Sequence, residues 1–84
     1  MSSWTRRQRD IMSLIVKGYS AGALLDIDEL MDLLANGVSK QATQCSIRFL
    51  EKRGVVKRTY HIRRNKRRMV IEPTPSGVVE FGVI

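Results

Sequence analysis

The fold is decided by residues Ser39–Arg68, which read SKQATQCSIRFLEKRGVVKRTYHIRRNKRR. Small and apolar side chains recur at helical spacing between residues 40 and 53 and share one side of a helix: Ala42, Thr43, Ser46, Ile47, Phe49 and Leu50. Gln41, Gln44 and Arg48 fall on the opposite side. Ser39 is placed to cap this helix and Gly54 to end it. The pattern predicts a helix over residues 40–53 with one polar face.

Two strand-like segments follow this helix, at residues 55–62 and 67–72. They predict an antiparallel hairpin over residues 55–72, which would form the wing of the domain. Its turn includes Asn65, because Asn tolerates the positive φ angles of tight hairpin turns. The tip of the hairpin is the run Arg63–Arg68, in which five of six residues are basic. The helix is therefore followed directly by a strongly cationic ribbon.

The charge of the chain is concentrated in this same region. The 84 residues carry 15 Lys and Arg against 8 Asp and Glu, for a net charge of +7. Residues 1–47 are neutral, residues 48–68 hold ten bases and one acid, and residues 69–84 contribute two acids. A face that binds a polyanion needs such clustering. A solvated face that merely aids solubility is the plainer alternative, but solubility requires no clustering.

Two further helices are predicted before the central one. Thr5 and Gln8 form a capping box for a helix over residues 5–17, and Gly18 is expected to end it. Residues 19–26 are predicted to be a loop with a short extended piece at 23–25. Asp26 and Glu29 form a second capping box for a helix over residues 27–35, whose many apolar residues predict that it is largely buried.

The segment Ala35–Ser39 joins the second helix to the third. Asn36-Gly37 accepts positive φ and lets the chain reverse within about four residues, while Val38 can fill the gap between the two helices. This arrangement is typical of a helix-turn-helix. After the hairpin, Thr74 and Pro75 are expected to begin a short helix over residues 75–82, with an apolar side formed by Val78, Val79, Phe81 and Ile84.

The predicted fold is therefore α+β, a winged helix-turn-helix in a single domain over residues 1–84. It has a three-helix core, a two- to three-stranded antiparallel sheet and a short C-terminal helix. A helix narrow enough for the major groove, followed by a cationic ribbon, predicts a protein that binds double-stranded DNA.

The order and spacing of these motifs resemble the MarR-like family of transcriptional regulators. The resemblance is carried by Trp4–Gln8, by Val38–Lys40 with Leu50–Val56, and by Arg67-Arg68 with Pro73–Gly77. It implies a regulator of transcription. The wing of that family carries two Asp residues that brace an Arg, and the matching positions here are Arg63 and Lys66. The long flanking helices that build the family's dimer and its ligand pocket have no counterpart in these residues, so no small-molecule ligand is expected.

The candidate DNA-binding residues fall into three groups. Gln41, Gln44 and Arg48 are the predicted base readers, because Gln pairs with adenine and Arg with guanine in the major groove. Arg48 lies further along the helix, so a phosphate contact is the alternative for it, and a plain solvated helix face is the alternative for the whole group. Phosphate contacts are predicted for Ser39, Lys40 and Lys52. Contacts from the wing to the minor groove or to phosphates are predicted for Arg63, Arg64, Asn65, Lys66 and Arg67.

Other functions have little support in the sequence. The chain has one Cys, Cys45, and one His, His61, and it has no glycine loop that could hold a phosphate. We therefore expect no enzyme activity, no cofactor, no metal and no internal disulfide. There is no apolar run of membrane-spanning length and no signal-peptide core. We therefore expect no membrane partner, and we expect a cytoplasmic, nucleoid-associated location.

The sequence favours a small sequence-specific regulator, with repression by promoter occlusion as the simplest mechanism. A DNA-binding accessory factor in replication, excision, packaging or plasmid maintenance is the first alternative. A protein-binding winged helix with an acidic partner is the second. RNA binding is disfavoured because the few aromatic residues form no stacking platform. The oligomeric state stays open, and a homodimer would bind a palindrome.

Overall fold

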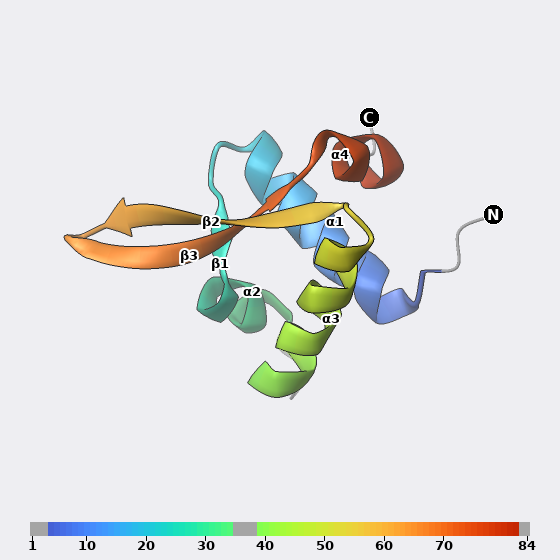
Figure 1. The fold of residues 1–84 in the computed structure, drawn as a ribbon, viewed down its shortest axis with the longest axis horizontal. Coiled ribbons are helices and arrows are strands. Elements are labelled where there is room, and N and C mark those ends of the chain that lie inside the picture. Colours follow the sequence, from blue (N-terminus) through green and yellow to red (C-terminus); the bar gives the residue numbers. More distant parts are fainter. Residues whose placement is uncertain (1–3, 35–38, 83–84) are drawn as a thin grey trace.

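The computed structural model describes residues 4–34 and 39–82 and has seven elements in these ranges (Figure 1). They follow in the order α1 (Arg6–Ser20), β1 (Leu25–Asp26), α2 (Ile27–Leu34), α3 (Lys40–Lys52), β2 (Val56–Arg63), β3 (Lys66–Pro73) and α4 (Pro75–Phe81). The helices gather at one end of the molecule, and the β2–β3 hairpin projects from them (Figure 1). The predicted α+β architecture with a winged hairpin is confirmed.

The sheet has three strands in the order β1-β3-β2, and both pairings are antiparallel. The short strand β1 pairs Leu25 with Ile71, so it covers only the base of β3. Strands β2 and β3 pair along their whole length, from Val56 opposite Pro73 to Arg63 opposite Lys66. The outer part of the hairpin is therefore a two-stranded ribbon.

Two residues, Arg64 and Asn65, form the turn of the hairpin. Both have positive φ, 52° and 62°. A two-residue turn with positive φ at both positions matches the right-handed twist of the flanking strands. Asn65 therefore lies in the turn as predicted, whereas Arg64 is a residue that seldom adopts this conformation.

The core lies where α1, α2 and α3 pack on the base of the sheet. Burying these apolar side chains supplies the main driving force for folding. The buried apolar residues are Ile11, Met12, Ile15, Val16, Leu30, Ile47, Leu50, Val55, Val56, Val70 and Ile71. No helix in residues 4–34 and 39–82 is both long and apolar enough to cross a membrane.

The predicted helix starts are confirmed by hydrogen bonds. Thr5 and Gln8 form the capping box of α1, with side-chain bonds in both directions. Asp26 accepts from the N–H of Glu29, and Glu29 accepts from the N–H of Asp26, so the second capping box is also present. At the starts of α3 and α4, the hydroxyls of Ser39 and Thr74 accept hydrogen bonds from the backbone N–H groups of Ala42 and Gly77.

The end of α1 differs from the prediction. Gly18 was expected to end the helix, but α1 continues to Ser20, and the residue with positive φ is Gly22 at +75°. Gly18 sits inside the helix where the chain returns against it, and a Cβ there would lie 2.7 Å from the carbonyl oxygen of Ala23. The glycine at this position therefore permits a close approach of two backbones.

Several predictions about burial were also wrong. The helix α2 was expected to be largely buried, but Leu30 is its one buried residue and Leu33 is 55% exposed. Ala42 and Phe49 of α3 and Val79 of α4 were assigned to apolar sides, yet all three are exposed. Helices that pack by one narrow stripe leave such flanking residues in solvent. The predicted turn at Asn36-Gly37, the predicted plug Val38 and Ile84 lie outside the described residues.

Candidate nucleic-acid interface

The helix α3 presents a polar face to solvent. Thr43, Ile47 and Leu50 are buried against the core, at a spacing of three to four residues. Four predicted DNA contacts of α3 are exposed: Lys40, Gln41, Arg48 and Lys52. Ser39, which caps the helix, is exposed as well. Most of the predicted contact residues of α3 are therefore accessible to a partner.

Gln44 is placed differently from its predicted position opposite the core. It is half-buried and lines a small recess of about 30 Å³ between α3 and the hairpin, with Ile27, Ile47, Arg58, Met69 and Ile71. It therefore lies on the flank of α3 that faces the sheet. The apolar stripe of α3 is centred on Thr43 and Ile47, so residue 44 borders the stripe.

Arg58 of β2 joins this flank of α3 to the hairpin. Its guanidinium donates two hydrogen bonds to one carboxylate oxygen of Glu51, at 2.6 and 3.1 Å. This hydrogen bond, with the charge of the same carboxylate, raises the pKa of Arg58 against the opposing effect of partial burial. The pair fixes the base of the wing on α3. Arg58 is not among the residues predicted from the sequence, because strand alternation does not reveal which helix a side chain will meet.

The tip of the wing is open to solvent. Arg64, Asn65, Lys66 and Arg67 are all exposed, as predicted contact residues should be. The guanidinium of Arg67 lies 4.0 Å from the centre of the Tyr60 ring, which is a cation–π arrangement. Tyr60 was not predicted as part of the site, although its position directly opposite Met69 and diagonal to Arg67 follows from the strand register.

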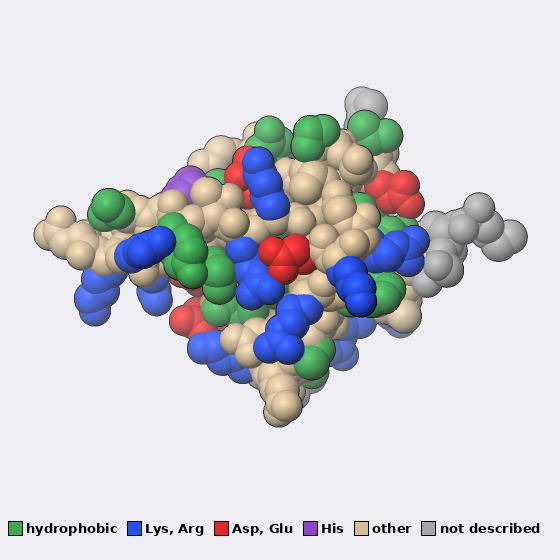
Figure 2. Space-filling view, viewed as in Figure 1, with side chains coloured by type: hydrophobic (Ala, Val, Ile, Leu, Met, Phe, Trp, Pro, Cys, Tyr) green, Lys and Arg blue, Asp and Glu red, His purple; other side chains and the backbone are tan. Residues whose placement is uncertain are grey.

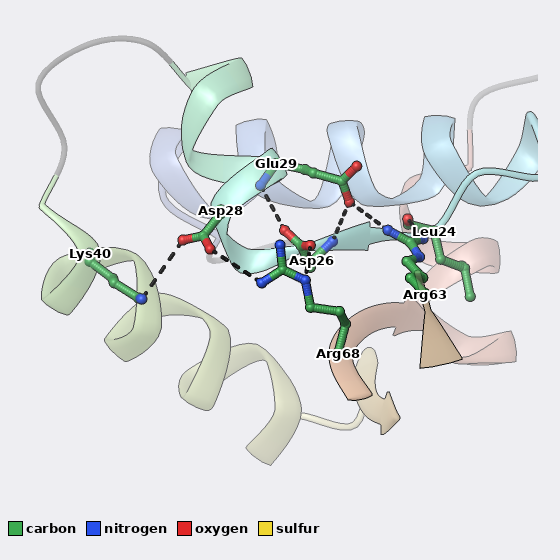
Figure 3. Close-up of polar contacts among 7 residues, drawn as sticks. All are labelled: Leu24, Asp26, Asp28, Glu29, Lys40, Arg63 and Arg68. Atoms are coloured by element: carbon green, nitrogen blue, oxygen red, sulfur yellow. Dashed lines mark hydrogen bonds and ion pairs between the residues drawn. The ribbon is translucent and has the colours of Figure 1, made fainter. Parts of the chain in front are cut away.

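Arg63, by contrast, is held by contacts within the protein (Figure 3). Its guanidinium donates to Oε1 of Glu29 at 2.8 Å and also to the carbonyl oxygen of Leu24. On the same face of the hairpin, Lys66 pairs opposite Arg63, and two residues further along β3 the Nε of Arg68 lies 3.7 Å from the buried carboxylate of Asp26. Arg63 therefore differs from the other predicted wing contacts in that its guanidinium already has partners within the protein.

Lys and Arg side chains lie over both α3 and the β2–β3 hairpin on one face of the molecule (Figure 2). Figure 2 shows few acidic side chains among them. Within the described part of the chain, five of the predicted site cations take part in no ion pair: Arg48, Lys52, Arg64, Lys66 and Arg67. These charges are available to an external polyanion.

Trp4 belongs to a separate cluster at the other end of α3. Its ring meets Phe81 and Phe49 edge to face, with centroids 5.1 and 6.4 Å away, and its indole N–H donates to Glu80. The Arg53 guanidinium lies 4.7 Å from the Trp4 ring. Trp4 thus packs α1 against α4 and the end of α3.

Residues 4–34 and 39–82 contain no group of His, Cys, Asp and Glu side chains suited to a metal ion.

The comparisons with known proteins bear on the fold. The architecture is that of the winged-helix class. A similar solved structure is the crystal structure of MepR from S. aureus in complex with DNA, a MarR-family winged-helix regulator, with a TM-score of 0.75 and 17% sequence identity. The match covers 96% of this chain and 55% of the MepR chain, so the present chain spans about half the length of that protein. No protein-family model matches the sequence, and no curated protein does.

Proposed function

We propose that this protein binds double-stranded DNA in a sequence-specific way and acts as a small transcriptional regulator. The observation that carries the proposal is the spread of Lys and Arg side chains over both α3 and the β2–β3 hairpin on one face, together with the exposed amide of Gln41 on α3. An α-helix fits the major groove, and a basic ribbon beside it can reach the adjacent minor groove or the phosphates. The shared fold with MepR, which was solved with DNA, supports the same interpretation.

Within this proposal the residues of α3 divide into readers and anchors. Gln41 and Arg48 reach base edges, and Gln44 completes this set from the flank of the helix next to the hairpin. Lys52, Ser39 and Lys40 contact phosphates, which position the helix without reading sequence. Repression by occupying a promoter is the mechanism that needs the fewest further parts, and such a protein acts at the nucleoid, in the cytoplasm.

The wing supplies a second set of contacts. Arg64, Lys66 and Arg67 have no acidic partner in the described residues, so their charges are free to neutralise phosphates or to enter an A·T-rich minor groove. Asn65 stands between them in the turn and adds a hydrogen-bonding amide. Arg63 contributes less to this surface, because its guanidinium is already bonded to Glu29 and Leu24.

Selection of duplexes from a random pool tests the proposal directly. The purified protein is expected to enrich one sequence and to bind it more tightly than a scrambled duplex of equal length, when both are measured by fluorescence anisotropy. The mass of the complex in the same titration reports whether one or two copies bind. Equal affinity for selected and scrambled duplexes would refute sequence reading. No duplex binding at moderate salt would favour a protein-binding role instead.

A further inference from the structure

The outer part of the wing has little apolar packing to fix its direction. Strand β1 pairs only with Val70 and Ile71 of β3, so the hairpin from residue 60 to residue 69 is a two-stranded ribbon. On one face of this ribbon Ile62 is 80% exposed, and Tyr60 is 57% exposed. Isolated two-stranded hairpins are marginally stable in water. Beyond the Arg58–Glu51 pair at its base, the outer part of the wing is held by contacts made from its other face.

Those contacts are ionic, and they lead from the wing to the start of α2 (Figure 3). Arg63 at the end of β2 is bonded to Glu29, whose same oxygen accepts the capping bond from the N–H of Asp26. One carboxylate thus fastens both the first turn of α2 and the wing. Because Arg63 also donates to the carbonyl of Leu24, its guanidinium holds two fixed points of the main body.

Asp28 extends this set of contacts to α3. One of its oxygens lies 3.7 Å from Nζ of Lys40 at the start of α3, and the other lies 4.0 Å from Nη1 of Arg68 in β3 (Figure 3). Arg68 also approaches the carboxylate of Asp26 at 3.7 Å. A single carboxylate therefore stands between the helix that we propose to enter the major groove and the hairpin that we propose to follow it.

We propose that Asp28 and Glu29 are positioning residues that set the direction of the wing relative to α3 and so restrict the groove spacing that the protein accepts. This inference rests on the proposed function. It also explains why two acids lie beside a basic wing. Carboxylates that form ion pairs with Arg63 and Arg68 reduce the non-specific attraction of these two residues to phosphates. Specificity then comes from disfavouring wrong duplexes as well as from favouring the right one.

The chain offers a matched control for this inference. Each of Asp28→Asn and Glu29→Gln removes one negative charge. Glu29→Gln also removes the ion pair with Arg63, and Asp28→Asn removes the contacts with Lys40 and Arg68. Asp28, Glu29 and Asp32 line one recess between α2 and the hairpin. Asp32→Asn removes the same charge from the same helix and the same recess, but Asp32 makes no ion pair among the described residues. The Gln side chain in Glu29→Gln keeps an oxygen that can accept the capping bond, so α2 should remain folded. Asp28→Glu, which keeps the charge, should behave as wild type.

The first measurement uses the free protein, so it does not depend on DNA. Residual dipolar couplings and ¹⁵N relaxation of the amides of residues 60–68 report the direction and the order of the wing. Asp28→Asn and Glu29→Gln should lower the order of these amides and reorient them relative to α3, while Asp32→Asn should leave both unchanged. An unchanged wing in both of the first two variants would overturn the inference, whatever the protein binds.

The second measurement compares binding to the selected and the scrambled duplex. Asp32→Asn should strengthen binding to both duplexes alike, because it removes only a repulsive charge. Asp28→Asn and Glu29→Gln should strengthen binding to the scrambled duplex and lower the preference for the selected one by about fivefold, the scale of one exposed ion pair. If Asp28→Asn and Glu29→Gln keep the same preference for the selected duplex as Asp32→Asn, the inference is overturned but the proposed function stands. Failure of the wild-type protein to bind any duplex would refute the proposed function.

Discussion

Neutralising the wing tip should weaken the salt dependence of DNA binding by a predictable amount. Five exposed cations are proposed to reach phosphates: Lys40, Lys52, Arg64, Lys66 and Arg67. If each neutralises one phosphate, log K should fall with log salt at a slope near −4.5. The double variant Arg64→Gln, Lys66→Gln removes two of these contacts, so its slope should be about −2.7.

This difference is large enough to measure by fluorescence anisotropy on one duplex. Between 50 and 200 mM salt, the wild-type affinity should fall about 500-fold and that of the double variant about 40-fold. Lys17→Gln is the control, because Lys17 is an exposed cation in the last turn of α1, away from the proposed interface. A slope in the double variant no shallower than that of Lys17→Gln would show that the wing tip does not contact phosphates.

Three further predictions concern the turn, the reading helix and the core. Arg64→Asn should raise the free energy of unfolding by about 0.5–1 kcal/mol in urea titrations, because Asn tolerates the φ of 52° at this position. The same variant should bind DNA more weakly, because it loses a cation. A lower free energy of unfolding would contradict backbone strain at Arg64. Gln41→Ala and Arg48→Ala should each cost about 1–3 kcal/mol on the selected duplex and less on a scrambled one, and equal losses on both would exclude base reading. Ile47→Ala should lower the free energy of unfolding by about 2–5 kcal/mol, since Ile47 is buried, and a loss under 1 kcal/mol would contradict that burial.

Local sequence signals predicted much of this fold because their causes are local. The capping boxes of Thr5 and Asp26 involve residues three positions apart, and the structure contains both. Gly54, with φ of +78°, follows the end of α3 as expected, because a helix end needs a residue that accepts this conformation. The hairpin strands differ from the predicted ranges by one residue at each end, since alternation and turn chemistry fix the register.

The features that sequence reasoning missed depend on distant residues. Gly18 was expected to end a helix, but its role is set by Ala23 and Leu25 returning against it. Arg63 looked like one more wing cation, and its partner Glu29 lies 34 positions away. Helical periodicity indicated that Gln44 lies on the polar side of α3, opposite the core. It could not show that the hairpin would lie beside this residue. Periodicity identifies a face, and tertiary packing decides what that face meets.

The burial pattern of α2 bears on function as well as on stability. Because Leu30 is its one buried residue, the exposed first turn can present Asp28 and Glu29 to the wing and to α3. The sequence suggested a largely buried α2; a helix whose first turn was covered would have left those carboxylates no access to Arg63 and Lys40. The error in predicted burial and the missed ion pairs therefore have one physical origin.

Amide chemical-shift mapping of the ¹⁵N-labelled protein with its selected duplex tests the proposed interface most directly. The largest changes should fall on the exposed residues of α3, above all Gln41 and Arg48, and on the wing tip at Arg64–Arg67, within a single titration. Changes confined to α1 and α4, around Trp4 and Phe81, or changes on α3 with none on the wing, would contradict binding through a shared cationic face.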